Sequence, residues 1–449
     1  MLFAGDPCYN TLMKAFDFGN LLRGKTVAVA LSGGGDSMAL LHYLCARAAE
    51  GGFCVAAVHV EHGIRGEASL KDAEFAEAYC REQKIPFYRY AVRARELAER
   101  EKLSLEAAAR RLRYACFEAA LTEKKCDFVA LAHHTGDQAE TVLMNLLRGA
   151  GMRGAGGMAP VRGRYLRPFL GVTKAEIAAY LKAFSIPYVT DETNFSADYT
   201  RNALRLRVLP AVGEIFPAYE SSLLRFARLA REDDAYLFSL AKAQVAKRDG
   251  ALCFPEDLPD PLFSRALLCA WKELGGGDYA GAQFEGAYAL KSLANGACRD
   301  LGGGIVAARE YGEIALYRPV KTPIPSYPFA EGAFSFCGWT LKAERAVERK
   351  EGLYADAGKI PPGACLRPRK EGDVFAPYGG GTRKLKEYFI DKKVPRRLRD
   401  RIPVLAAGNT VYFVAGMEIS DLIKVDKDTV NMIKLTYQRD TEEKENRDV

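Results

Sequence analysis

KTVAVALSGGGDSMALL, residues Lys25–Leu41, contains three successive patterns that decide the fold. Thr26–Leu31 is a short apolar run, partly β-branched, which predicts a buried parallel strand. Ser32–Ser37 (SGGGDS) interrupts that run, and Met38–Leu41 begins a helical pattern. The stretch therefore predicts a strand, a glycine loop and a helix in immediate succession.

The glycine loop is expected to bind an anion. A strand–loop–helix turn presents free backbone N–H groups and a helix N-terminus, and successive glycines allow close approach of the ligand. Asp36 is either the helix N-cap or a ligand for the metal that accompanies a polyphosphate. The residues expected to hold the anion are Ser32, Gly33, Gly34, Gly35, Asp36 and Ser37.

The loop sequence narrows the class of anion. No Lys-Ser or Lys-Thr follows it, so it is not a Walker A loop, and its glycines do not fit G-x-G-x-x-G. SGGGDS resembles the SGGxDS loop of the PP-loop, or N-type, ATP pyrophosphatases. That resemblance implies cleavage of ATP to AMP and pyrophosphate in order to activate an oxygen for replacement. The alternative is a glycine-rich turn without a ligand.

Apolar runs and helical patterns alternate through the N-terminal half. Two of the helical patterns, Ser69–Gln83 and Ser104–Lys124, begin at a serine suited to capping a helix. Polar clusters follow three of the predicted strands. The pattern predicts a doubly wound α/β domain with a mostly parallel sheet and one site at its carboxyl edge. The predicted strands are Thr26–Leu31, Phe53–Val60, Ile85–Val92 and Phe128–Ala132.

Positive charge is concentrated near the C-terminus. The net charge is +7, and 12 basic against 5 acidic residues lie between Arg367 and Arg401, so the rest of the chain is balanced. Concentrated positive charge predicts a polyanion partner, and a solvated basic face is the alternative.

Cysteine usage and hydropathy exclude other classes. The eleven cysteines include no Cys-x-x-Cys pair, which argues against a zinc ribbon or a cysteine-held iron–sulfur cluster and favours reduced thiols. The N-terminus does not resemble a signal peptide, and the apolar runs are too short for a membrane span. We therefore expect a cytoplasmic protein without membrane partners.

The order of patterns predicts three domains and a tail. Residues 1–210 form the α/β domain that carries the glycine loop, and 211–330 form a mainly helical domain. Residues 331–440 form a small, basic α+β domain, and 441–449 form a polar tail.

Five ordered blocks resemble bacterial tRNA(Ile)-lysidine synthetases. They are Val58–Ala73, Ala109–Tyr114, Ala132–Gly157, Leu166–Leu170 and Asp191–Pro210, and the basic stretch from Arg367 to Arg396 resembles the family's C-terminal domain. The resemblance implies ATP-dependent ligation of L-lysine to carbon 2 of the wobble cytidine in tRNA(Ile) with a CAU anticodon, through an adenylated cytidine. It also implies that residues 1–210 are the catalytic domain, that 211–330 bind tRNA or serve as a scaffold, and that 331–440 bind tRNA. Two positions depart from the family pattern: Gly136 replaces the first Asp of DDQ, and Glu418 replaces a usual Arg.

Candidate catalytic residues follow from chemistry beside this resemblance. Asp137 and Glu140, at i and i+3, share a helix face, and with Asp36 they suit magnesium. His133 follows a strand end and can reach phosphate or the transferred group. Arginines can neutralise polyphosphate or RNA. The predicted catalytic set is Asp36, Arg113, His133, Asp137 and Arg205, with Asp36 and Asp137 as magnesium ligands.

A second set is expected to contact tRNA. Basic residues interleaved with Tyr388 and Phe389 suit a phosphate backbone with exposed bases. Asn202 is expected to share a helix face with Arg205. The predicted tRNA-binding residues are Arg201, Asn202, Arg383, Lys384, Lys386, Lys392, Lys393 and Arg396.

Three other functions remain open from the sequence. One is a PP-loop enzyme that thiolates tRNA, against which the lack of Cys-x-x-Cys argues. Another is a PP-loop synthetase with a small-molecule substrate, and the third is a catalytically silent RNA-binding protein. The sequence leaves the oligomeric state open, with a homodimer as one option.

Overall fold

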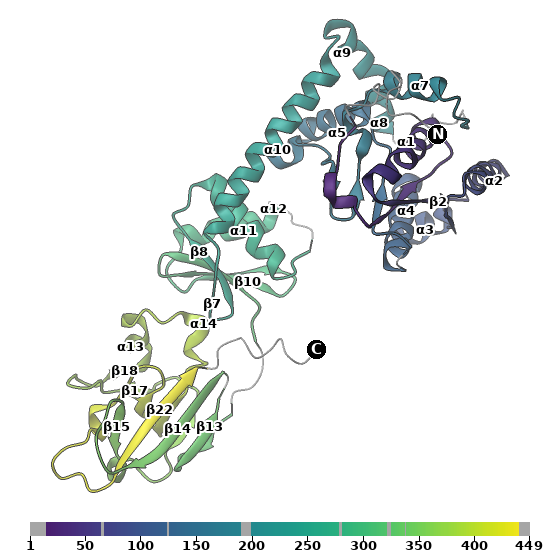
Figure 1. Cartoon of the computed structure of the whole chain (residues 1–449). Helices are drawn as coiled ribbons and strands as arrows, with labels where there is room; N and C mark the ends of the chain where they lie inside the picture. The colour runs from purple at the N-terminus through teal and green to yellow at the C-terminus, as the bar shows by residue number, and fades with distance from the viewer. Residues whose placement is uncertain are drawn as a thin grey trace. The chain divides into compact units, whose positions relative to one another are not determined.

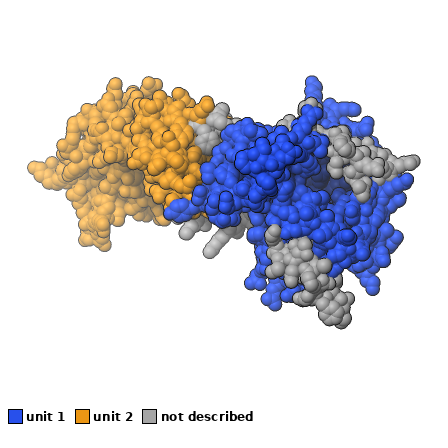
Figure 2. Space-filling model, turned by 90° about the horizontal axis from the view of Figure 1, so that it is seen from above, with its two compact units in different colours: residues 1–236 blue, residues 237–449 orange. Residues whose placement is uncertain are grey.

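The computed structural model describes residues 15–63, 67–123, 125–189, 199–277, 281–320, 325–336 and 338–439. The chain divides into two compact units, residues 1–236 and 237–449 (Figure 2). Within the described residues, none of the helices combines the length and apolar character that a membrane span requires. Residues 191–198 of the predicted Asp191–Pro210 block, the stretch 321–324 and the tail 441–449 lie outside the described residues.

Unit 1 is built on a six-stranded sheet with the order β3-β2-β1-β4-β6-β5. All neighbouring pairs are parallel except β5 with β6. The order reverses at β1, between β2 and β4, and ligands of doubly wound sheets bind at such a reversal. The strands are β1 (Thr26–Ala30), β2 (Cys54–Glu61), β3 (Phe87–Ala91), β4 (Phe128–Ala130), β5 (Val161–Arg162) and β6 (Tyr165–Leu166).

Helices cover both faces of this sheet, which confirms the predicted doubly wound fold (Figure 1). Val27 and Val29 of β1 share a core with Met38 of α1, whereas Ala28 between them packs with Phe117 of α4. The helices of the region are α1 (Gly35–Gly51), α2 (Glu67–Glu82), α3 (Ala94–Glu101), α4 (Leu105–Thr122), α5 (Thr135–Leu147), α6 (Met152–Ala155), α7 (Lys174–Ala183), α8 (Tyr199–Ala203), α9 (Leu209–Ile215) and α10 (Tyr219–Ala243). A π-helical turn, Leu204–Val208, joins α8 to α9.

Two of three predicted helix caps are wrong. Ser104 does cap α4, because its side chain accepts a hydrogen bond from the Ala107 N–H at 3.2 Å. Ser69 lies inside α2, which already includes Glu67. Gly34 is the N-cap of α1, so Asp36 lies in the first turn of that helix and does not cap it.

Unit 2 contains a sheet that the sequence did not predict. The segment expected to be mainly helical has α11 (Asp260–Glu273) and α12 (Gly281–Ala289), but also a five-stranded antiparallel sheet ordered β7-β8-β11-β10-β9. The sequence between Gly302 and Tyr317 predicts only a β-hairpin, which β10 and β11 form. The strands are β7 (Ala246–Arg248), β8 (Ala251–Pro255), β9 (Cys298–Gly302), β10 (Ile305–Glu310) and β11 (Glu313–Tyr317).

The rest of unit 2 has the expected α+β character, with two further sheets. One has the order β12-β16-β19-β20-β17-β18 with β21 beside β20, and the other has the order β13-β14-β22-β15. The elements are β12 (Tyr327–Pro328), β13 (Gly332–Ser335), β14 (Trp339–Ala346), β15 (Leu353–Asp356), β16 (Cys365–Arg367), β17 (Val374–Phe375), β18 (Arg383–Lys384), α13 (Leu385–Asp391), α14 (Arg396–Arg399), β19 (Val404–Ala407), β20 (Thr410–Val414), β21 (Glu418–Ile419) and β22 (Met432–Arg439).

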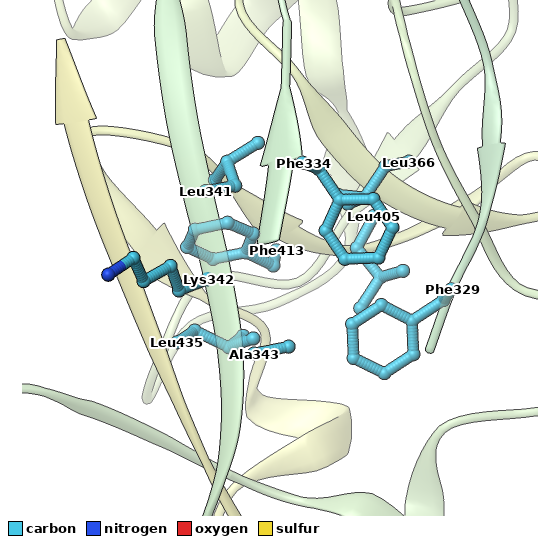
Figure 3. Close-up of a pocket in the computed structure, with 9 residues that line it drawn as sticks. All are labelled: Phe329, Phe334, Leu341, Lys342, Ala343, Leu366, Leu405, Phe413 and Leu435. Carbon is cyan, nitrogen blue, oxygen red and sulfur yellow. The ribbon is translucent and has the colours of Figure 1, made fainter. Parts of the chain in front are cut away.

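A cavity between these two sheets is part of the core and not a ligand site. Its volume is about 10 Å³, and its lining is almost entirely apolar (Figure 3). Phe334, Leu341 and Leu435 come from one sheet, and Leu366, Leu405 and Phe413 come from the other. Such a space holds at most a single water-sized sphere.

Candidate active site

The glycine loop is held in shape by its two serines. The Ser37 hydroxyl donates to the Gly34 carbonyl at 2.9 Å and accepts from the Ser32 N–H at 3.2 Å. The Gly34 N–H donates to Ser32 Oγ at 3.3 Å. Gly33 has φ +87°, a conformation that favours glycine. The serines thus shape the loop, and the first N–H groups of α1 have no partner within the helix.

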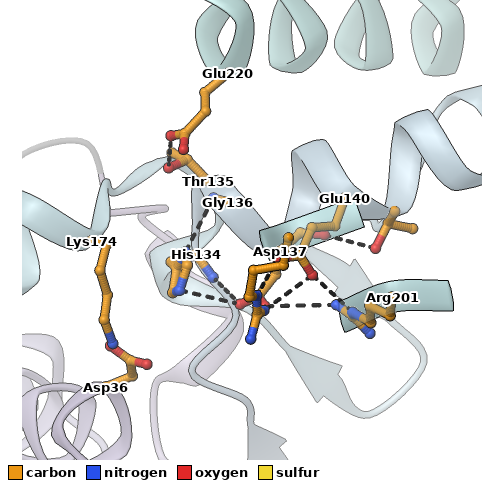
Figure 4. A network of polar contacts seen from close by, with 11 residues as sticks. Asp36, His134, Thr135, Gly136, Asp137, Glu140, Lys174, Arg201 and Glu220 are labelled. Carbon is orange, nitrogen blue, oxygen red and sulfur yellow. Dashed lines mark hydrogen bonds and ion pairs between the residues drawn. The ribbon is translucent and has the colours of Figure 1, made fainter. Parts of the chain in front are cut away.

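Asp36 forms an ion pair with Lys174 at the start of α7 (Figure 4). The lysine side chain is mostly exposed, and Asp36 is about one-third exposed. Asp36 lies in the first turn of α1, where the partial positive charge of the helix end also favours a carboxylate. The predicted metal ligand Asp36 is therefore already paired with a cationic group, the Lys174 ammonium.

The first turn of α5 is organised by a reciprocal cap. His134 Nδ1 accepts a hydrogen bond from the Gly136 N–H at 3.1 Å, and the His134 N–H donates to Asp137 Oδ2 at 3.1 Å. Burial raises the pKa of Asp137, but the His134 ring and N–H, His133 and Arg201 together outweigh burial and lower it. Asp137 is therefore an ionised carboxylate with a fixed orientation.

Asp137 and Glu140 share a face of α5, as the sequence predicted, and both meet arginines from the segment that follows α7 (Figure 4). Arg201 Nε donates to Glu140 Oε2 at 2.8 Å, and Arg205 donates to Glu140 Oε1 at 2.5 Å. Arg205 also reaches Asp137 Oδ1 at 3.2 Å. Burial lowers the pKa of Arg205, but Glu140 and Asp137 outweigh that effect and raise it. The two guanidinium groups are thus engaged by carboxylates.

His133 is a neutral base in a positively charged environment. Burial lowers its pKa to about 4; Asp137 opposes this shift, while Arg167, Arg201 and Arg110 add to it. The buried Nδ1 of His133 has no hydrogen-bond partner among the described residues. A neutral imidazole with a free nitrogen can accept a proton or a hydrogen bond from a ligand.

Arg113 lies beside His62, a second histidine with a buried nitrogen that has no hydrogen-bond partner among the described residues. Its Nε donates to His62 Nε2 at 3.3 Å, and burial lowers the pKa of Arg113. Burial also lowers the pKa of His62 to about 4, with Arg113 and His59 adding to the effect. Arg110 adds to the effect of burial in lowering the pKa of Arg113 and of Arg167, as expected in a positively charged environment suited to an anion.

The structure brings most of the predicted catalytic residues to one edge of the sheet. Strand β1 leads into the loop with Asp36, and β4 leads into His133 and Asp137. Sequence reasoning missed Arg110, Arg167 and Lys174 as site residues. Arg110 lies one helical turn from Arg113 and could have been found by that spacing, whereas no local pattern marks Lys174. The described residues contain no group of three or more His, Cys, Asp or Glu side chains positioned for a metal.

Comparisons with known proteins match both the N-terminal and the C-terminal parts of the chain. The family model of the PP-loop domain matches residues 9–212, and that of the TilS substrate C-terminal domain matches residues 365–435. The tRNA(Ile)-lysidine synthase of Caldanaerobacter subterraneus is 33% identical over 92% of this chain and 94% of its own. The chain belongs to the tRNA(Ile)-lysidine synthase family. The family member of Symbiobacterium thermophilum is also 33% identical, over 94% of this chain and 95% of its own.

In this lysidine synthase family member, the C-terminal basic segment is less available than its sequence suggests. Arg367, Arg369, Arg383 and Arg397 form ion pairs with Asp373, Asp400, Asp391 and Glu310. The Arg367–Asp373 pair is completely buried, with two hydrogen bonds of 2.8 Å. Exposed basic side chains among the predicted tRNA-binding residues are Lys384, Lys386, Lys392, Lys393 and Arg396.

Tyr388 and Phe389, which the sequence places among basic residues suited to RNA, are buried and not available to RNA bases. Both side chains have no exposed surface, because α13 turns them into the core against Phe375. Arg383 and Lys392 instead lie over the Tyr388 ring, at 5.1 and 5.6 Å from its centroid.

Glu418, the second departure from the family pattern, has a structural role here. The Tyr388 hydroxyl donates a hydrogen bond to Glu418 Oε1, and Lys392 Nζ lies 3.7 Å from the same oxygen. Burial, with Glu418, raises the pKa of Tyr388 far above its ordinary value. Glu418 therefore holds α13 in place, where a family arginine would have added positive charge.

Arg397 attaches this C-terminal region to the five-stranded sheet within unit 2. Its Nε donates to Glu310 Oε2 at 3.2 Å, and the ion-paired side chains are both buried. Arg399 adds a hydrogen bond to the Tyr311 hydroxyl at 3.0 Å. These arginines are structural, and only Arg396 of the predicted tRNA-binding set lies beside them, 3.4 Å from the Gly296 carbonyl.

Proposed function

We propose that this chain ligates L-lysine to carbon 2 of the wobble cytidine of tRNA(Ile) bearing CAU, using ATP and releasing AMP and pyrophosphate. One observation carries the proposal: family models match both ends of a chain whose named relatives align over more than nine-tenths of its length. The proposed tRNA and ATP substrates make the cytoplasm the expected compartment.

The ATP half of the reaction is assigned to the glycine loop. The loop N–H groups and the N-terminus of α1 suit the polyphosphate, and the carbon-2 oxygen of cytidine attacks the α-phosphorus while pyrophosphate leaves. Asp36 fits a magnesium ligand because its ion-pair partner, Lys174, is exposed and able to move away. Magnesium there would neutralise charge on the phosphates. Asp137 fits this role less well, since His134 and two arginines already hold it.

The lysine half of the reaction is assigned to the His133 region. The side-chain amine of lysine attacks carbon 2, the bond to the adenylated oxygen breaks, and AMP leaves with that oxygen. The amine must lose a proton, and the candidate acceptor is His133 Nδ1, which is buried and has no hydrogen-bond partner among the described residues. Arg113 and its neighbours favour the negative charge that develops on the departing AMP.

Binding of the tRNA is assigned to the exposed lysines of the C-terminal region. Lys384 and Lys386 are exposed at the start of α13 and belong to the segment matched by the C-terminal family model. Exposed lysines bind phosphate without reading sequence. A wobble base must be splayed out of the anticodon loop to react, as single-stranded RNA bases commonly are when bound.

Incorporation of radiolabelled lysine tests the proposal. The assay contains ATP, magnesium and tRNA(Ile) with CAU, and methionine tRNA with the same anticodon is the matched control. Incorporation confined to tRNA(Ile) is expected. AMP formation without lysine incorporation would overturn the lysine assignment while leaving the nucleotide chemistry in place.

A further inference from the structure

Gly136 leaves the first turn of α5 without the acidic side chain that the family pattern carries there. The family sequence AHHxDDQ has aspartate at this position, whereas this chain has His134-Thr135-Gly136-Asp137. Acidic residues in the first turn of a helix offset its partial positive charge. Asp137 remains as an acidic residue of that turn, so the chain either supplies the second carboxylate from elsewhere or functions with one.

A carboxylate from another helix lies next to this position. A Cβ atom built on Gly136 would be 3.0 Å from the His134 ring and 3.8 Å from Glu220 Oε1. The adjacent Thr135 hydroxyl donates to Glu220 Oε2 at 2.9 Å (Figure 4). Glu220 belongs to the first turn of α10, 85 residues further along the chain than Thr135. Its carboxylate thus approaches the same end of α5 that an aspartate at 136 would occupy.

The same contact limits the freedom of the arginine segment. Residues 201–220 meet α5 at both ends: Arg201 and Arg205 bind Asp137 and Glu140 at one end, and Glu220 binds Thr135 at the other. A segment attached at two points has fewer accessible positions than one attached at a single point. Glu220 therefore helps to fix the guanidinium groups over the carboxylates of α5.

We propose that Glu220 is a positioning residue that replaces the family's aspartate at 136 and fixes the arginine segment over the first two turns of α5. This inference rests on the proposed function, because its role is to align Asp137, His133 and the arginines for lysine transfer. Glu220 acts through these groups and is not assigned a contact with substrate.

A double-mutant cycle tests the replacement. The variants are Glu220→Gln, Gly136→Asp and the double variant, with Glu214→Gln on the exposed face of α9 as the matched control. Glu220→Gln should lower kcat about fivefold to tenfold with KM for tRNA within about twofold, since neighbouring groups couple strongly. Gly136→Asp should also lose activity, because its side chain crowds the His134 ring and places a second carboxylate beside Glu220. The double variant should return to within about threefold of wild type.

The double-mutant cycle is measured by two assays, so that a failure of the Glu220 proposal can be distinguished from a failure of the proposed function. Lysine incorporation gives kcat and KM, and the midpoint of thermal unfolding reports coupling between positions 136 and 220 without any reaction. A wild-type enzyme that incorporates no lysine contradicts the proposed function alone. Wild-type kinetics in Glu220→Gln, or additive losses in the double variant by both readouts, would overturn the role of Glu220.

Discussion

Replacing Glu140 with glutamine should destabilise unit 1 and disable the site together. The Glu140 side chain is 4% exposed and accepts hydrogen bonds from Arg201 and from two nitrogens of Arg205. Glutamine keeps the shape but removes the charge, so both guanidinium groups would lose a buried anionic partner. Removing one partner of a buried ion pair costs about 3–5 kcal/mol.

The expected cost is at or below the lower end of that range. Arg201 and Arg205 are 27% and 43% exposed, so water compensates part of the lost interaction, and about 2–3 kcal/mol is expected. For a unit of this size each 1 kcal/mol lowers the unfolding midpoint by about 2–4 °C, which gives a decrease of roughly 4–12 °C. Lysine incorporation should fall at least about tenfold, since Arg205 loses its principal partner.

Thermal unfolding followed by circular dichroism measures the stability change. Glu232→Gln is the matched control, because Glu232 pairs with Arg228 on α10 and both side chains are more than half exposed. That change should cost under about 1 kcal/mol. A midpoint for Glu140→Gln within about 2 °C of wild type, or an equal decrease in both variants, would refute the reasoning.

Three further outcomes are expected. Burial lowers the pKa of His133 to about 4 in the folded state, so the unfolded chain binds the extra proton first as pH falls. Stability should decrease between about pH 6.5 and 4, and His133→Asn should flatten that dependence in urea titrations; an unchanged slope would contradict the assigned pKa. Lys174→Ala should lower the magnesium concentration needed for half-maximal AMP formation several-fold, because Asp36 loses its competing cation; an increased requirement would show that Lys174 assists binding. Lys384→Glu with Lys386→Glu should weaken tRNA binding most at low salt, and equal affinity across a salt series would exclude these lysines from the interface.

The sequence predicted the N-terminal fold because its signals are local. An apolar run followed by glycines and a helical pattern marks β1 and α1. Apolar runs that alternate with helical patterns mark β2 to β4. Ser104 caps its helix as predicted, but Ser69 does not, since an acceptable cap residue also occurs inside helices. The residue at which a helix begins therefore depends on which of several suitable cap residues the chain uses.

The unpredicted parts depend on contacts that no local pattern encodes. Strand β8, Ala251–Pro255, is a five-residue apolar run, which periodicity cannot distinguish from a buried helical segment. Lys174 meets Asp36 across 138 residues, and Glu220 meets Thr135 across 85. Tyr388 and Phe389 were misassigned because adjacent aromatics in a basic stretch can face either solvent or core, and packing against Phe375 decides the outcome.

The ion pairs of the basic segment reduce the number of counterions that tRNA binding can release. Binding to a polyanion depends on salt through the phosphates that protein cations neutralise. Arg367, Arg369, Arg383 and Arg397 are already neutralised by acidic partners within unit 2. The salt dependence of binding should therefore follow the exposed lysines around α13 and remain well below the value that twelve basic residues would produce.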